Sequence, residues 1–171
     1  LWELGRSPNW PRNREPWRQP ADSLPAETPG HLTEIVTEEA IAALERLSEE
    51  DKPWFLNLWY FAPHGPLDPG KRFAARYPDT PEGQYRATIE QLDDSIGRVL
   101  AGVSELGLAE NTLVIFLSDN GGTGIQLDNN APLKGIKGQF REGGVRTPMI
   151  WNWPGVLNAG KVVDDPVSFL D

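Results

Sequence analysis

Two stretches of the chain repeat their apolar residues at the spacing of an amphipathic helix. Within 33–50 an apolar residue returns every three or four positions, and most of the glutamates fall between these positions. Thr33 is placed to cap this helix, and Pro53 lies just beyond its end. A longer stripe of the same kind predicts a second helix over 84–106, with Gly107 as its C-cap.

Three shorter apolar runs have the character of strands. The run 54–61 (WFLNLWYF) lies between two prolines, and the other two runs occupy 112–117 and 148–151. Their length and their aromatic and β-branched residues favour strands that are buried on both faces. Buried strands separated by amphipathic helices predict an α/β fold, in which helices cover both faces of a mostly parallel sheet.

The chain divides into two parts of different character. Residues 1–30 are rich in proline, arginine and tryptophan without periodicity, which predicts an irregular segment. Residues 31–171 contain every predicted helix and strand and are long enough for one domain. The chain contains no cysteine, which excludes disulfides, thiolate metal ligands and cysteine nucleophiles within it. No apolar run approaches the length of a membrane span, so we expect no membrane partner.

The distribution of charge favours a small anion over a nucleic acid as the ligand. The chain has 16 Lys and Arg against 25 Asp and Glu, a net charge of −9, and binding to nucleic acid needs a basic face. The stretch 129–153 is locally basic, with a balance of +3 from four basic residues and one acidic residue: Lys134, Lys137, Arg141, Arg146 and Glu142. A basic loop in an acidic chain suits a small anion.

Polar side chains follow two of the predicted strands. The segment 62–66 (APHGP) follows the first run, and 118–122 (SDNGG) follows the second. Ligands of open α/β sheets bind at the carboxyl ends of strands, so we expect both segments at one edge of the sheet. Asp119 and Asn120 offer the oxygen ligands that calcium or magnesium prefers. The alternative is a simple hairpin turn, because Asn-Gly after a strand is a common turn signal.

Two further side chains are candidates for contact with an anion. His64 lies in a proline-rich segment whose stiff backbone directs its ring, and an imidazole can hydrogen-bond an anion or protonate a leaving group. Lys137 lies in a glycine-rich loop that leaves its ammonium group accessible. The alternatives are an ordinary loop histidine and a solvated lysine. The pair Asp93-Asp94 falls inside the second predicted helix and is interpreted as solvated, and His31 is interpreted as a surface residue.

Taken together, these segments resemble the sulfatase family of the alkaline-phosphatase-like superfamily. The matching segments follow the family order and cover nearly everything from Thr33 onward: TEIVTEEAIAAL at 33–44, APHGP at 62–66, YRATIEQLDDSIGRVL at 85–100, TLVIFLSDNGG at 112–122 and LKGIKGQFREGGVRTPMIWNWPG at 133–155. The resemblance implies that Asp119 and Asn120 are two ligands of a divalent cation, usually calcium. It also implies that His64 and Lys137 contact the sulfate group. The implied fold is part of a large α/β sandwich.

The resemblance also shows what this chain does not contain. The family nucleophile is a formylglycine made from the Cys or Ser of a C/S-x-P-x-R motif, which has no match here. The paired aspartates after the first family strand and the lysine-histidine pair of the first half have no match either. The chain therefore resembles a central part of a sulfatase, and we expect the nucleophile upstream of it.

The resemblance implies hydrolysis of sulfate esters, with a sulfated small molecule or glycan as substrate. It also implies a periplasmic, secreted or lysosome-like location. Two alternatives stay open at this point: a phosphomonoester or phosphonate hydrolase of the same superfamily, and a non-catalytic fragment that keeps the fold. Asn120 favours the sulfatase, because a phosphatase often has histidine at this position.

Overall fold

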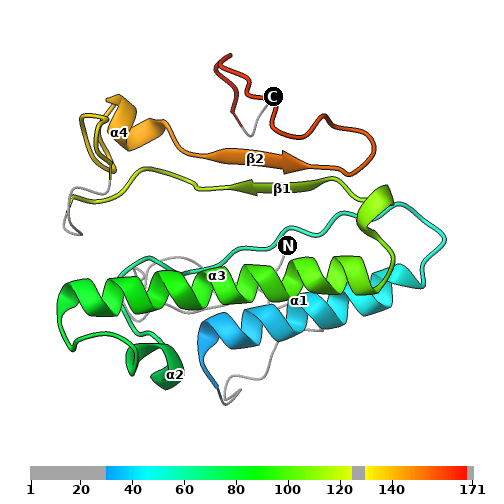
Figure 1. Cartoon of the computed structure of the whole chain (residues 1–171), viewed down its shortest axis with the longest axis horizontal. Helices are drawn as coiled ribbons and strands as arrows, with labels where there is room; N and C mark the ends of the chain where they lie inside the picture. Colours follow the sequence, from blue (N-terminus) through cyan, green and yellow to red (C-terminus); the bar gives the residue numbers. More distant parts are fainter. Residues whose placement is uncertain (1–29, 125–129, 169–171) are drawn as a thin grey trace, which may run out of the picture.

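The structure is a computed structural model that describes residues 30–124 and 130–168. The predicted irregular segment 1–30 therefore lies almost wholly outside the described residues. Along the chain the elements are α1 (Leu32–Ser48), α2 (Lys71–Ala74), α3 (Pro81–Glu105), a 3-10 turn η1 (Ala109–Asn111), β1 (Val114–Leu117), α4 (Glu142–Val145) and β2 (Met149–Asn152). Figure 1 shows α1 and α3 side by side in one layer and the β1–β2 ribbon in another.

The two long helices are the two that the apolar stripes predict, and they pack on each other. Their buried faces combine small and branched side chains, including Val36, Ala40 and Leu44 on α1 and Ala87 and Val103 on α3. Gly102 comes close to Leu44 without crowding, because a Cβ built on it would lie 3.9 Å from that side chain. Close approach of the two backbones is what the small residues allow. No helix among the described residues has the length and apolar character needed to cross a bilayer.

The helix ends differ in part from the sequence prediction. The N-cap of α1 is His31, whose Nδ1 accepts a hydrogen bond from the Thr33 backbone N–H at 3.2 Å, so the predicted Thr33 cap is wrong. Helix α3 ends at Glu105 with Leu106 as its C-cap, and Gly107, the predicted C-cap, follows one position later in the left-handed region with φ +70°. Its N–H bonds the Ser104 carbonyl while the next N–H bonds that of Val103, which is a Schellman motif.

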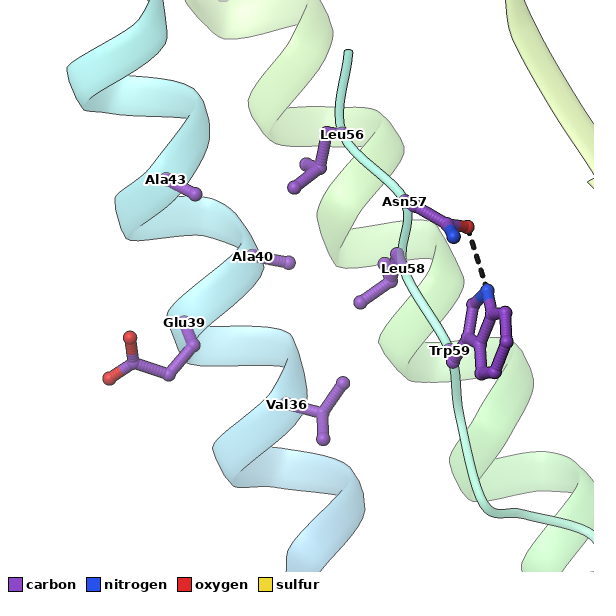
Figure 2. A pocket seen from close by; sticks show the side chains of 8 residues that line it. All are labelled: Val36, Glu39, Ala40, Ala43, Leu56, Asn57, Leu58 and Trp59. Atoms are coloured by element: carbon purple, nitrogen blue, oxygen red, sulfur yellow. Dashed lines mark hydrogen bonds between the residues drawn. The ribbon is translucent and has the colours of Figure 1, made fainter. Parts of the chain in front are cut away.

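The apolar run 54–61 is extended but forms no strand with the described residues. The backbone of residues 54–60 forms no hydrogen bond with the backbone of the described residues. Instead, the run packs along α1. Figure 2 shows Leu56 and Leu58 directed toward the face of α1 that carries Val36 and Ala40. The cavity left between them has a volume of about 30 Å³, room for roughly one or two waters and too small for a substrate.

A hydrogen bond from Tyr60 joins the same run to α1. The Thr37 hydroxyl donates to the Thr33 carbonyl at 2.6 Å, so the 3.0 Å contact between the Thr37 and Tyr60 oxygens is donated by Tyr60. Burial raises the pKa of the Tyr60 hydroxyl above its ordinary value of 10.0, and the Arg98 charge only partly offsets that effect. The folded chain therefore holds the Tyr60 proton more tightly than the unfolded chain.

We expect Tyr60→Phe to lower the free energy of unfolding at pH 8 by about 1 kcal/mol, the usual net worth of one hydrogen bond. A raised pKa stabilises the fold fully below pH 10, and this stabilisation is lost as pH rises through the pKa of the folded state. Urea unfolding between pH 9 and pH 11 should thus show a steeper loss of stability for the wild type than for Tyr60→Phe. Equal slopes for the two proteins would contradict this assignment.

The two strands that form are antiparallel, so the prediction of a mostly parallel sheet is not confirmed. Val114 pairs with Asn152 and Leu117 with Met149. Neighbouring residues of a strand point to opposite faces, and both Ile115 and Phe116 are exposed, as are Ile150 and Trp151 opposite them. Both faces of the β1–β2 ribbon are therefore open and apolar.

Candidate functional site

The segment after β1 is joined to the glycine-rich loop by backbone hydrogen bonds. The Lys137 N–H donates to the Gly122 carbonyl at 2.9 Å, and the Gly121 N–H donates to the Gly144 carbonyl at 3.0 Å. A third bond, from the Gly143 N–H to the Lys134 carbonyl at 2.9 Å, closes the loop on itself. We call these two segments, 118–122 and 134–145, the loop clamp. The predicted metal ligands and Lys137 therefore belong to one connected unit.

Asn130 holds the loop clamp with its side chain. Its Oδ1 accepts from the Gly122 N–H at 2.8 Å, and its Nδ2 donates to the carbonyls of Gly122 at 2.9 Å and Gly135 at 3.1 Å. The amide thus satisfies both backbone groups of Gly122. Because a backbone N–H only donates and a carbonyl only accepts, these partners specify the orientation of the amide.

The glycines of the loop clamp are required by its close backbone contacts. A Cβ built on Gly121 would lie 1.8 Å from the Gly143 carbonyl oxygen, and one on Gly144 would lie 2.3 Å from that of Gln139. No side chain fits at such distances, so these glycines allow two backbone segments to touch.

Asp119 and Asn120 lie at the carboxyl end of β1, as the sequence predicts. Asp119 is exposed and makes no hydrogen bond or ion pair with the described residues. Asn120 is half-buried, and its Nδ2 donates to the Gly121 carbonyl at 2.9 Å, which directs Oδ1 away from that contact. The alternative of a hairpin turn is wrong, because β2, the partner of β1, begins only at Met149.

The chemistry of these two groups fits a hard divalent cation, but their number does not complete a site. A carboxylate and an amide oxygen are suitable ligands, whereas calcium takes six to eight oxygens. Within 30–124 and 130–168 no cluster of three or more acidic, histidine or cysteine side chains could hold a metal. Asp119 and Asn120 could therefore supply two of the oxygen ligands of such a cation, and the side chains of the described residues provide no complete acidic cluster around them.

Positive charge gathers on the second segment of the loop clamp. Glu142 pairs with Arg146 at 3.4 Å, both exposed, which neutralises the one acid of the loop. Lys134, Lys137 and Arg141 are exposed and form no ion pair with the described residues. Exposed, uncompensated cations beside two oxygen ligands suit an anion that also contacts a cation.

His64 is exposed and lies in a turn after the extended run. Its N–H bonds the Phe61 carbonyl at 2.9 Å, its Nδ1 lies 2.7 Å from the Gly65 carbonyl oxygen, and its ring lies 5.1 Å from that of Phe61. No hydrogen bond or ion pair among the described residues joins His64 to the loop clamp. In Figure 1 the run 54–61 and β1 point the same way, and the segments that follow them lie toward the same side of the view.

The residues that the sequence analysis sets aside, the pair Asp93-Asp94 and His31, behave differently in the structure. Asp93 is exposed on α3 and Asp94 pairs with Arg72 at 3.7 Å, which agrees with a solvated helix face. His31 is not a free surface residue. It is half-buried, caps α1 and contacts both Gln91 and the Asp68 carbonyl. The sequence analysis missed this contact and also missed Asn130.

Comparisons with known proteins agree on one family. The Sulfatase family matches residues 4–171. A sulfatase of Formosa agariphila is 36% identical over 150 residues, which cover 79% of this chain and 27% of that protein. Steryl-sulfatase of Mus musculus is 38% identical over 152 residues, covering 83% of this chain and 23% of that protein. The chain thus spans about a quarter of the length of the curated relatives it matches.

Solved structures give the same result. The crystal structure of Ps i-CgsB matches with a TM-score of 0.75 and 32% identity, over 82% of this chain and 32% of that one. Its complex with k-i-k-neocarrahexaose matches with a TM-score of 0.72, over 79% of this chain and 30% of that one. The matched family covers nearly the whole sequence, including the loop clamp and the histidine turn. The chain belongs to the sulfatase family.

Proposed function

We propose that this chain is the central part of a sulfuric-ester hydrolase that cleaves sulfate esters. The observation that carries the proposal is the loop clamp, which ties Lys137 by its backbone to Gly122, two residues after Asn120. One connected unit therefore presents a carboxylate, an amide oxygen and an ammonium group. Such a set suits a tetrahedral anion bound beside a cation.

Each side chain has a separate role in this proposal. Lys137 neutralises charge that develops on the sulfate oxygens, and His64 hydrogen-bonds the oxygen of the leaving group. Asp119 and Asn120 are two ligands of a divalent cation that prefers hard oxygen donors, with calcium as our choice because the family resemblance implies it. The bound cation would polarise the sulfate group. The chain lacks the C/S-x-P-x-R motif, so the formylglycine that supplies the nucleophile would lie upstream of Leu1.

The open apolar surfaces support the view that a larger sheet surrounds this part. The backbone groups of residues 54–60 have no backbone partner among the described residues, Phe55 and Trp59 are largely exposed, and both faces of the β1–β2 ribbon are open. Buried sheets satisfy such groups by further strands and covering helices. In the complete protein we place the run 54–61 and β1 in one mostly parallel sheet. We refer to the protein that includes the upstream sequence as the longer form.

The relatives and the family resemblance are the basis for a proposed substrate class and location. Relatives include a steryl-sulfatase, an N-acetylgalactosamine-6-sulfatase and the protein bound to k-i-k-neocarrahexaose. For this protein we propose a sulfated glycan or sulfated small molecule as substrate, in a periplasmic, secreted or lysosome-like location.

The sharpest test compares two esters that share one leaving group. We expect the longer form to hydrolyse 4-nitrophenyl sulfate at least about 100-fold faster than 4-nitrophenyl phosphate, as judged by kcat/KM with calcium present. Sulfate and phosphate are similar in size, so the ratio reports the charge and the nucleophile of the site. A preference for the phosphate ester would favour the phosphatase alternative and refute the proposal.

A further inference from the structure

Gln91 on α3 is a buried polar side chain whose three hydrogen bonds reach two other segments, the N-terminal end of α1 and the chain at Gly70. Its exposed fraction is 1%. Its Oε1 accepts from the Gly70 N–H at 2.8 Å, and its Nε2 lies 3.1 Å from His31 Nδ1 and 3.2 Å from a Glu34 carboxylate oxygen. Because the Gly70 N–H only donates and the carboxylate only accepts, the amide has one orientation that satisfies all three partners.

His31 extends this connection to a second backbone group. Its Nε2 contacts the Asp68 carbonyl oxygen, which only accepts, so Nε2 carries the proton. Its Nδ1 then accepts from the Thr33 N–H and from Gln91. One neutral tautomer therefore fits every partner. Through these bonds, Gln91 and His31 hold the main chain at Asp68 and at Gly70.

The segment held in this way carries His64. Its beginning is attached to α1 through Tyr60, and its end is attached to α3 through Gln91. Between these points the imidazole of His64 contacts its own turn, through the Gly65 carbonyl and the Phe61 ring. No side chain from another described element bonds the imidazole. Its position is therefore set by the two attached ends of the segment.

Packing alone does not explain a glutamine at this buried position. An apolar side chain of similar volume can fill such a site at little or no net cost, whereas a buried amide is costly unless every bond is made. Directional bonds determine where the partner backbone lies, which apolar packing does less sharply. The network thus determines the position of residues 68–70 relative to α1 and α3.

We propose that Gln91 is a positioning residue that, together with His31, holds the segment 61–70 so that His64 reaches the sulfate ester. This inference rests on the proposed function, because it takes His64 as the group beside the leaving-group oxygen. The effect should appear in kcat, since a small displacement of a group that acts in the transition state costs rate more than substrate affinity.

The test replaces Gln91 by methionine in the longer form, which keeps the volume and removes all three hydrogen bonds. We expect kcat for 4-nitrophenyl sulfate to fall about tenfold, with KM changed by less than about twofold. Thr88→Val is the matched control. Thr88 is also buried on α3, but its hydroxyl bonds only the Gln84 carbonyl of the same helix at 2.8 Å, so kcat should stay within about twofold.

A double-mutant cycle separates positioning from general damage. If Gln91 acts through His64, Gln91→Met should lower kcat no further in a His64→Ala background. Full additivity of the two effects, or an unchanged kcat in Gln91→Met, would overturn the positioning role. Hydrogen exchange gives a readout without activity, because the Gly70 amide should exchange at least about tenfold faster in Gln91→Met. If the wild-type longer form has no sulfatase activity, the proposed function is wrong. If kcat depends on His64 but not on Gln91, only this inference is wrong.

Discussion

Replacing Lys137 with alanine is expected to lower kcat of the longer form on an aryl sulfate by about 100- to 1,000-fold. The charge of Lys137 forms no ion pair with the described residues, and its backbone is held against Gly122 at 2.9 Å. In the proposed site the Lys137 ammonium group faces the oxygens of the bound sulfate, where it stabilises the negative charge that develops on them. The loss of one preorganised donor of this kind has that magnitude. Steady-state kinetics with 4-nitrophenyl sulfate measures the effect.

Lys134 provides a control within the same loop. It is also exposed and forms no ion pair with the described residues, so Lys134→Ala removes the same charge three positions earlier. We expect a change of less than about threefold, because a diffuse loss of charge in water is heavily screened. Equal losses for the two variants would mean that the loop acts through its general field and that Lys137 makes no specific contact.

The second large effect is expected at Gly121. A Cβ at this position would lie 1.8 Å from the Gly143 carbonyl oxygen, so alanine must push the two segments of the loop clamp apart. That movement also breaks the bond from the Gly121 N–H to the Gly144 carbonyl. We expect Gly121→Ala to lower the free energy of unfolding by about 3 kcal/mol, as measured by urea denaturation.

Gly97 is the matched control for this substitution. It lies inside α3, and nothing stands within 4 Å of the place that a Cβ would take. Alanine should therefore stabilise the chain by about 0.5–1 kcal/mol through its higher helix propensity. A Gly121→Ala variant with the same free energy of unfolding as the wild type would contradict this prediction, because the loop clamp would then accept a Cβ without loss of stability.

The sequence predicts the long helices well because their stability depends on a repeating stripe. The predicted ranges 33–50 and 84–106 correspond to Leu32–Ser48 and Pro81–Glu105. The errors lie at the ends, where single side chains decide. His31 caps α1 because its unprotonated Nδ1 accepts a hydrogen bond, a role more often taken by Ser, Thr, Asp or Asn. In the same way Thr80 and Pro81 begin α3 one turn before the apolar stripe does.

Strand pairing was less accessible to prediction. An apolar run without alternation shows that a segment is buried but gives neither its partner nor its direction. The run 112–117 contains β1 and the run 148–151 overlaps β2 except for Asn152, yet their antiparallel register depends on the long loop between them. The run 54–61 has the composition of a strand and is extended, but among the described residues it finds no backbone partner.

The candidate site could be predicted from side chains but not from backbone contacts. Asp119, Asn120 and Lys137 stand out by residue type, and their placement around one loop clamp remains consistent with the predicted roles. The hydrogen bonds that join the two segments of the loop clamp come from the backbone of glycines and from the Asn130 side chain. The partners of Asn130, Gly122 and Gly135, lie on either side of Asn130 in the sequence. Adjacent glycines at 121–122 and 143–144 are the one signal of such close approach.

The most direct test of the central claim compares the 171-residue chain and the longer form in the same aryl sulfate assay. The claim is that this chain supplies the residues that bind and polarise the sulfate, whereas the nucleophile lies upstream. We therefore expect turnover by the longer form and none by the purified chain, because no Cys or Ser here lies in the C/S-x-P-x-R motif from which formylglycine is made. Reproducible turnover by the chain alone, abolished by His64→Ala, would contradict the account, because it would require a nucleophile within these residues.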